Sequence, residues 1–247
     1  MRSLLVIGLL AGCNARLGTA PADRDATTLG SDSGVGPTNV VADAAPDAKP
    51  LCGNGRVIYL NFEGASLAQA ATSDATQDKA VWLGQANGTL AQFRPGAGDR
   101  TTQIDNTVTA FKTGIAGHPD IQVVTTRPTT SPFFEIGFGG SADDVSVPYL
   151  YAVDRLDCGD TATKSDIGWV FEAAESPQRA ANFALGALLF GLGATGTTNP
   201  NDCMCGWLTN CQASNNACTY STSINAATGC NVPNPVNETT YLDHFCD

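Results

Sequence analysis

The stretch Ser176–Gly191, SPQRAANFALGALLFG, carries the clearest helix signal in this chain of 247 residues. Ser176 is a favoured N-cap residue, and Pro177 suits the first helical position because its missing N–H would find no intrahelical partner there. The run that follows is unbroken up to Phe190, and Gly191 is a residue type that commonly stops a helix. The stretch therefore predicts a helix that ends at Gly191.

Runs of β-branched and aromatic residues upstream of this helix predict strands. The predicted strands cover residues 57–62, 121–126, 133–138, 149–153 and 167–171. A further helix is predicted over about 106–117, and a short last helix over 238–245, whereas residues 65–105 are weakly patterned. Strands mixed with two well-separated helices are typical of an α/β or α+β domain.

The beginning of the chain has the features of an export signal. A positively charged MR pair precedes Ser3–Leu10, an apolar run too short to span a bilayer, which takes about 20 apolar residues. The run ends in LAGC, residues 10–13, which resembles the lipobox of bacterial lipoproteins. In that family the chain is cut before the cysteine, whose sulfur is then acylated. The resemblance implies a signal peptide over 1–12 and a lipid on Cys13 that anchors the protein to a membrane of the cell envelope.

Residues 13–50 are expected to form the lipidated cysteine and a disordered linker. The stretch is rich in Ala, Asp, Gly, Pro and Thr and lacks aromatic residues, so it cannot bury enough apolar surface to offset the loss of chain entropy. Asn14 is not the aspartate that marks inner-membrane retention in some bacteria, which favours the outer membrane. The net charge of −11 offers no basic surface to neutralise phosphates, so no nucleic acid partner is expected.

The globular part is expected to comprise a core over 51–202 and a cysteine-rich segment of the same domain over 203–247. There are nine cysteines, and the eight that follow Cys13 predict four disulfides, because their number is even and export leads to an oxidising compartment. The eight are Cys52, Cys158, Cys203, Cys205, Cys211, Cys218, Cys230 and Cys246. A zinc cluster within 203–218 is the alternative, although its spacing matches no standard zinc knuckle. The disulfide connectivity stays open.

Gly191 is followed by Leu192 and, at residues 199–204, by NPNDCM. This order resembles the metzincin zinc peptidases, which carry the motif His-Glu-x-x-His-x-x-Gly-x-x-His and then a turn with a methionine. Two of the histidines share a helix face, the third completes the zinc site, and the glutamate is the base for the zinc-bound water. With Gly191 at the motif's glycine, Met204 falls in the methionine turn. The histidine positions are then occupied by Ala184, Leu188 and Ala194, and the position of the base by Leu185.

The resemblance extends over about 57–206, where IYLNFEG at 58–64, VVTTRP at 123–128 and WVF at 169–171 are similar to strands of bacterial secreted peptidases of this group. It implies a mixed, mostly parallel twisted sheet with two main helices. The substituted side chains cannot bind zinc, and a chain with two histidines cannot form a three-histidine site. The implied protein is a pseudopeptidase without a metal or other cofactor, in which apolar packing closes the former zinc cavity.

The leading functional hypothesis is a non-catalytic binding or structural module displayed at the cell envelope. In active metzincins the substrate peptide lies along an edge strand above the zinc. Residues 133–138 are the expected counterpart of that strand, which could capture an extended peptide or protein partner by strand addition.

An enzyme of another type, using carboxylates or a metal such as calcium, is the alternative. The candidate carboxylates are Glu172, Glu175, Asp143 and Asp144. A Cys–His nucleophile at Cys246 and His244 is disfavoured, because Cys246 is expected to be oxidised and residues two apart on a helix do not face each other. His118, next to a proline, is expected in a surface turn.

Overall fold

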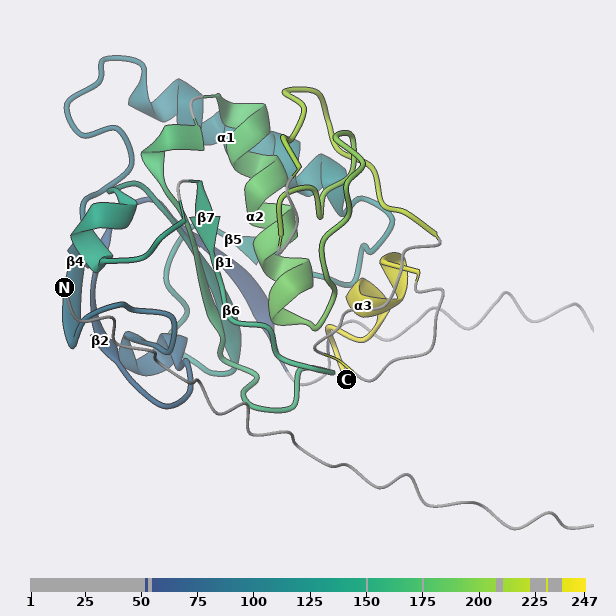
Figure 1. The fold of residues 1–247 in the computed structure, drawn as a ribbon, viewed down its shortest axis with the longest axis horizontal. Coiled ribbons are helices and arrows are strands. Elements are labelled where there is room, and N and C mark those ends of the chain that lie inside the picture. The colour runs from purple at the N-terminus through teal and green to yellow at the C-terminus, as the bar shows by residue number, and fades with distance from the viewer. Residues whose placement is uncertain are drawn as a thin grey trace, which may run out of the picture. The chain divides into compact units, whose positions relative to one another are not determined.

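A five-stranded, mostly parallel sheet lies at the centre of the computed structural model (Figure 1). The structure describes residues 52, 55–149, 151–174, 176–207, 211–222, 230 and 237–247, all in the compact unit Asp47–Asp247. In spatial order, the strands are β5 (Val123–Val124), β1 (Val57–Asn61), β6 (Phe133–Phe138), β8 (Ile167–Val170) and β7 (Ala152–Val153). Four strands are parallel, and β7 runs antiparallel to β8 at one edge. The predicted mixed α/β fold with a mostly parallel sheet is confirmed.

The central strand β6 explains how the two faces of this sheet are used. Successive side chains of a strand point to opposite faces. Phe134, Ile136 and Phe138 pack with the helices, whereas Phe133 packs with a second, smaller sheet on the other face. Every residue of β6 is buried, as expected for a strand covered on both faces. The prediction that residues 133–138 form an edge strand is therefore wrong: β6 lies between β1 and β8, and the antiparallel edge strand is β7.

Two helices, α1 (Arg100–Gly114) and α2 (Pro177–Gly191), cover one face of the main sheet (Figure 1). The predicted start of α1 at about residue 106 is six residues late, because its first turns are polar and give no apolar periodicity. Helix α2 begins as predicted: the Ser176 side chain accepts a hydrogen bond from the Arg179 N–H at 3.2 Å.

Helix α2 ends at Gly191, as predicted, but Gly191 is not the residue that turns the chain. Gly191 is the last residue inside the helix, and it is Gly193 that adopts the left-handed conformation, with φ 107°. The N–H of Gly193 bonds the carbonyl of Phe190 at 3.0 Å, and the N–H of Ala194 bonds that of Leu189 at 2.8 Å. This pair of bonds is a Schellman motif that closes the helix, and its left-handed residue is Gly193, two residues after the predicted helix end.

The weakly patterned region folds into a small sheet on the opposite face of the main sheet. Its strands are β2 (Ala65–Gln69), β3 (Lys79–Ala80) and β4 (Asn87–Leu90), in the order β3-β2-β4. Three short 3₁₀ helices, which had no sequence prediction, are η1 (Ala75–Gln77), η2 (Ala142–Val145) and η3 (Glu172–Ala174). The indole of Trp169 fills the space between the two sheets, which requires a glycine at 137, because a Cβ there would lie 2.0 Å from the ring.

Four disulfides tie the cysteine-rich segment to itself and to the core. The pairs are Cys52–Cys246, Cys158–Cys230, Cys203–Cys218 and Cys205–Cys211. The predicted number of disulfides is confirmed. The four cysteines of the alternative zinc cluster form two of these bonds, Cys203–Cys218 and Cys205–Cys211. The last helix, α3 (Thr239–Asp243), is shorter than predicted. The buried guanidinium of Arg56 donates to the Asp160 carboxylate at 3.1 Å and to the carbonyl of Phe245 at 3.0 Å, which joins β1 to the C-terminal residues.

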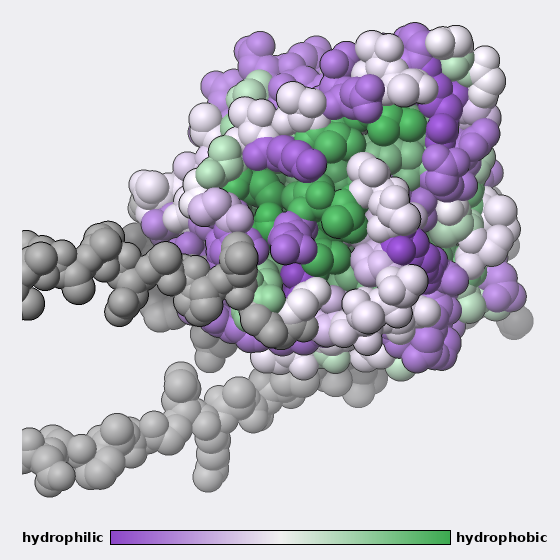
Figure 2. All heavy atoms as spheres, turned by 180° about the vertical axis from the view of Figure 1, so that it is seen from behind, coloured by the Kyte–Doolittle hydropathy of each residue, from purple (hydrophilic) through white to green (hydrophobic). Residues whose placement is uncertain are grey.

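Among the described residues, the large apolar side chains are buried or partly buried except for Tyr149, which is 49 % exposed. Figure 2 shows the side of the molecule opposite to that of Figure 1, where apolar residues gather in the middle of the face and hydrophilic residues surround them. Among the described residues, no helix is long and apolar enough to cross a membrane.

Candidate functional site

The positions that the sequence resemblance aligned with zinc ligands lie in the apolar core. Ala184 and Leu188 on α2, Ala194 after it, and Met204 are fully buried and belong to one cluster of apolar side chains. Their side chains hold no nitrogen or oxygen atom, and a bound zinc ion would need three such ligands. Leu185, at the position of the base, packs against α1, where a Cβ at Gly114 would lie 2.4 Å from its Cδ1. These residues contribute packing and no metal-binding group.

The loop around Met204 is held together by backbone and carboxylate bonds within the segment that follows α2. The Met204 N–H donates to Oδ1 of Asp202 at 2.8 Å, and its carbonyl accepts from the Thr197 N–H at 3.1 Å. A Cβ at Gly196 would lie 1.5 Å from the carbonyl oxygen of Trp207, so only glycine fits that position. The segment after α2 thus doubles back and brings Trp207 onto the helix.

Each of the two histidines lies beside an aspartate. Nδ1 of His118 lies 3.3 Å from the Asp243 carboxylate, and the exposed His244 contacts Asp247 three residues away. Cys246 is oxidised, as expected, so it offers no thiolate to His244.

The carboxylates of the alternative hypothesis have local structural partners. Glu172 accepts the backbone N–H of Arg94 at 2.8 Å. Asp144 accepts the N–H of Ser141 at 2.8 Å in a capping box, and Asp143 is exposed beside it. Glu175 lies outside the described residues, as does Cys13.

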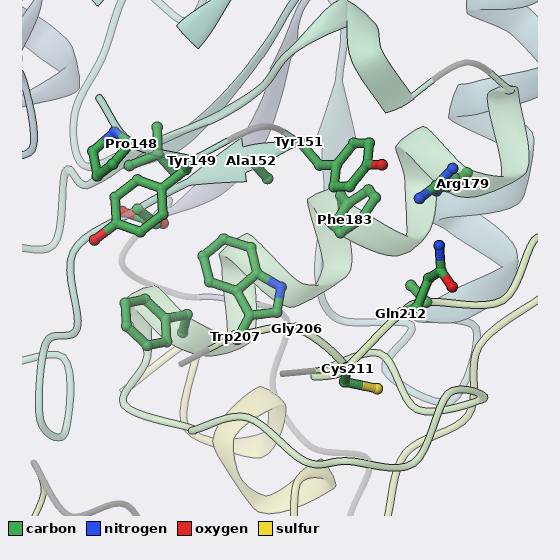
Figure 3. A pocket seen from close by; sticks show the side chains of 14 residues that line it. Pro148, Tyr149, Tyr151, Ala152, Arg179, Phe183, Gly206, Trp207, Cys211 and Gln212 are labelled. Carbon is green, nitrogen blue, oxygen red and sulfur yellow. The ribbon is translucent and has the colours of Figure 1, made fainter. Parts of the chain in front are cut away.

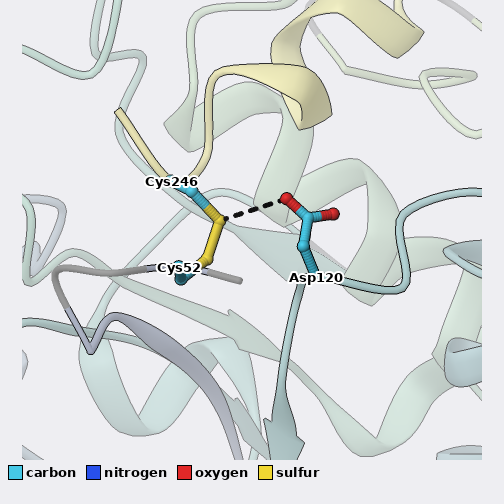
Figure 4. Close-up of side chains that lie close together, drawn as sticks. All are labelled: Cys52, Asp120 and Cys246. Carbon is cyan, nitrogen blue, oxygen red and sulfur yellow. Dashed lines mark hydrogen bonds between the residues drawn. A yellow bond between two sulfur atoms is a disulfide. The ribbon is translucent and has the colours of Figure 1, made fainter. Parts of the chain in front are cut away.

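One group of potential metal ligands converges within the part of the chain that the structure describes. Cys52, Asp120 and Cys246 bring their ligand atoms within 4.8 Å of one another (Figure 4). The two sulfur atoms are joined in a disulfide, and Sγ of Cys246 lies 3.6 Å from Oδ2 of Asp120. A disulfide sulfur cannot act as a thiolate ligand, so this group is a cross-link beside a carboxylate.

A cavity of about 680 Å³ lies between the edge strand β7, helix α2 and the loop that follows Met204 (Figure 3). Its aromatic lining comes from all three elements: Tyr149, Tyr151, Phe183, Phe190 and Trp207. Its polar side chains are those of Asp154, Arg179 and Gln212. A cavity of this size with aromatic walls and several polar groups has the character of a ligand-binding site.

The aromatic rings of the cavity are arranged in two pairs. Tyr151 stacks on Phe183 with 5.1 Å between ring centroids, and Phe190 lies at the same distance from Trp207. The guanidinium of Arg179 lies 4.4 Å from the centroid of the Tyr151 ring (Figure 3). The first pair therefore already holds a cation on an aromatic face.

Asp154, directly after β7, is 8 % exposed as a residue and is one of those that line the same cavity. Its Oδ1 accepts the Arg155 N–H at 2.6 Å, whereas Oδ2 has no hydrogen-bond partner. A Cβ at Gly168 would lie 2.7 Å from Oδ2, so glycine on β8 leaves room for the carboxyl group. Burial, and secondarily the nearby charge of Asp166, raises the pKa of Asp154 well above its usual value.

Sequence reasoning located the helix that carries this cavity but not the cavity itself. The sequence analysis singled out Ala184 and Leu188 on this helix. The charged residues of the cavity are instead Arg179, near the start of the helix, and Asp154, which follows the two-residue strand β7. Arg179 is the only charged residue of α2, and a charged residue in an apolar helix was the available signal. Asp154 carried no comparable signal.

No protein-family model matches this chain, and no curated protein has significant sequence similarity to it.

Proposed function

We propose that this protein is a non-catalytic, lipid-anchored module of the cell envelope whose metzincin-like domain binds an extended peptide or protein segment. The observation that carries the loss of catalysis is the complete burial of Ala184, Leu188 and Ala194 among apolar side chains. A zinc ion at these positions would have no ligand and no coordinated water to activate.

Three features support the metzincin-like part of the proposal. The main sheet is mixed and mostly parallel, with two helices on one face. Helix α2 leads into a sharp turn at Gly193, and the buried Met204 lies in a loop that packs against that helix. This is the order of elements that the sequence resemblance implied.

Strand β7 is the candidate for peptide capture, in place of the central β6. The N–H of Phe171 donates to the carbonyl of Tyr151 at 2.8 Å, so Tyr151 uses its carbonyl toward β8. In an antiparallel pair, consecutive residues alternate between facing the neighbour and facing away. The N–H and carbonyl of Ala152 are then directed to the open edge of the sheet, beside the cavity. Backbone groups directed to the edge of a sheet in this way can bind extended peptides by strand addition.

Substitution of Ala152 by proline tests this assignment. The change removes an N–H that points away from β8, whereas Val153→Pro removes one that β8 uses and serves as the destabilising comparison. Fluorescence anisotropy with a panel of ten-residue labelled peptides, each with a different central residue, measures binding to the full chain. We expect binding of part of the panel, weakened at least tenfold by Ala152→Pro while the protein remains folded by circular dichroism. A folded wild-type chain that binds no peptide, or unchanged binding by Ala152→Pro, contradicts the proposal.

Restoration of a metal site tests the metzincin-like assignment. The double variant Ala184→His with Leu188→His places two imidazoles on one helix face, and Ala194→His adds a third. If the three positions converge, the triple variant binds zinc at least tenfold more tightly than the double variant. A triple variant with Thr197→His in place of Ala194→His is the control for a nonspecific gain in zinc affinity. Equal affinity of the two triple variants in isothermal titration, or chelator-sensitive peptide cleavage by the wild-type protein, argues against the assignment.

The position of Asp154 favours one second candidate, an enzyme that uses a carboxyl group as a general acid. A buried carboxyl group with a raised pKa that lines a cavity is a common feature of acid–base catalysts. Hydrolysis of peptide, ester or glycoside substrates that is abolished in Asp154→Asn and insensitive to a chelator would favour this candidate over a binding module.

The lipid anchor on Cys13 and location at the outer membrane form the remaining part of the proposal. Incorporation of labelled palmitate by the wild-type chain but not by Cys13→Ser, followed by separation of inner and outer membranes, is the direct test. Palmitate labelling of the variant would contradict the assignment of Cys13.

A further inference from the structure

We infer that the cavity beside β7 accepts a basic side chain, lysine or arginine, of a peptide bound along that strand. The inference deepens the proposed function and rests on it, because strand pairing at Ala152 is what brings a peptide side chain over the cavity. The aromatic rings supply the walls, and Asp154 supplies the counter-charge.

The aromatic lining favours a cation over an apolar guest of the same size. The faces of tyrosine, phenylalanine and tryptophan rings attract ammonium and guanidinium groups. In this structure Arg179 already lies on Tyr151, at 4.4 Å, and more distantly on Phe183, at 5.7 Å. The rings of Phe190 and Trp207 form the second pair in the cavity, and no arginine or lysine of the described residues is recorded over them.

Asp154 gives the cavity a site for the charge of such a guest. Its Oδ2 is buried without a hydrogen-bond partner, which is unfavourable for a polar atom and is relieved when a donor enters. A lysine ammonium or an arginine guanidinium is a donor of the opposite charge, and charge-assisted hydrogen bonds are stronger than neutral ones. The net charge of −11 favours the approach of a basic peptide over that of an acidic one.

The charged groups around Asp154 influence the pKa of its carboxyl group, and through it any release of protons on binding. Those that act on its carboxyl group are Asp166 at the start of β8 and Asp157 and Asp160 in the loop after β7, while Arg179 on α2 lines the same cavity. The three acidic neighbours add to the effect of burial and raise the pKa of Asp154 further. A bound cation stabilises the carboxylate form and so lowers this pKa, and any proton that Asp154 gives up on binding passes to the buffer.

Calorimetric titration of the full chain with three matched peptides tests the inference. The peptides carry lysine, norleucine or glutamate at the centre of an otherwise uncharged, N-acetylated and C-amidated alanine–threonine sequence. Norleucine keeps the length of the lysine side chain without its charge. We expect the lysine peptide to bind at least tenfold more tightly than the norleucine peptide. Titration in two buffers of different ionisation enthalpy is expected to show a net release of protons on binding of the lysine peptide.

Variants connect the preference to the cavity. Asp154→Asn is expected to reduce the preference for lysine to less than about threefold and to abolish proton release, whereas Asp143→Asn, at an exposed position, leaves both unchanged. Tyr149→Ser removes an exposed ring without disturbing the core and is expected to weaken lysine binding several-fold. Equal affinity for lysine and norleucine overturns the inference while peptide binding itself stands. Absence of binding by all three peptides to the folded chain overturns the inference and the proposed function together.

Discussion

Oδ2 of Asp154 lies 3.0 Å from the point that a Cβ atom on Gly191 would occupy. Gly191 is the residue on which the metzincin resemblance was aligned, and in the structure it has a role unrelated to a turn. The glycine is needed because the Asp154 carboxyl group and the Phe134 ring both approach the end of α2, and it is Gly193 that turns the chain.

Gly191→Ala is therefore expected to destabilise the protein. The new methyl group would lie 2.6 Å from Cζ of the buried Phe134 as well as against Asp154, so the core must shift, at a cost of about 1–3 kcal/mol. Gly98→Ala is the control, because a Cβ there meets no atom within 4 Å. Urea unfolding of both variants measures the difference, and equal midpoints would show that the end of α2 is not closely packed.

The free energy of unfolding is expected to fall as the pH rises from about 5 to 8. Burial, followed by the charge of Asp202, raises the pKa of Glu238 to about 8, and burial raises that of Glu135 to about 7. The unfolded chain releases these protons near pH 4.3, so between the two values the folded state holds protons that the unfolded state has lost. Stability from these groups is complete below the unfolded pKa and decreases up to the folded pKa.

Glu238→Gln is expected to reduce this dependence. The amide oxygen can still accept the N–H of Ser221, which bonds Oε2 of Glu238 at 2.9 Å, but the group no longer ionises. We expect the variant to be more stable than wild type at pH 8, by about 1 kcal/mol or more, and little different at pH 5. Glu63→Gln, at an exposed position, is the control. Parallel pH profiles of wild type and Glu238→Gln would contradict the assignment.

Removal of single disulfides is expected to have effects that increase with the length of the chain they close. Loop-closure entropy gives about 5 kcal/mol for Cys52–Cys246, which spans 194 residues, and about 2 kcal/mol for Cys205–Cys211, which spans 6. Paired serine substitutions and thermal unfolding measure both. Trp207, which lines the cavity, lies in the loop that Cys205–Cys211 closes. Removal of this disulfide is therefore expected to weaken lysine-peptide binding, although its effect on stability is the smaller of the two. The reverse order of destabilisation would contradict the loop-closure argument.

Prolonged dialysis against a strong chelator is expected to leave the unfolding temperature unchanged. A metal bound to the folded state would raise that temperature by mass action, and its removal would lower it. The potential ligands at Cys52, Asp120 and Cys246 are engaged in a disulfide and its neighbouring carboxylate. A fall in the unfolding temperature that calcium or zinc reverses would favour the alternative of a metal-dependent enzyme.

Sequence patterns located the elements whose signals are local. Strand β6 and the start of α2 were predicted correctly, because a continuous apolar run and a Ser-Pro cap act over a few residues. The position of β6 within the sheet was wrong, because strand order depends on long-range pairing that periodicity does not encode. The small sheet β2-β3-β4 was missed for a related reason: its strands contain alanine, glycine and polar residues, and they are stable only against the main sheet.

The candidate site shows the same division. The absence of zinc ligands could be read directly from Ala184, Leu188 and Ala194. The cavity could not, because it joins Asp154, Arg179 and Trp207 from three separate elements. The space for the Asp154 carboxyl group depends on the absence of side chains at Gly168 and Gly191. The sequence does not show this, because β8 and α2 come together only in the folded protein.

The bond between Cys52 and Cys246 has a mechanical consequence. It makes almost the whole domain a covalent ring, since the two residues are 194 positions apart. A pull between the two ends of the domain would load that sulfur–sulfur bond before any strand hydrogen bond, so stretching would leave the sheet folded until the bond is reduced. Exopeptidases that trim either end would likewise stop near the ring while it remains folded.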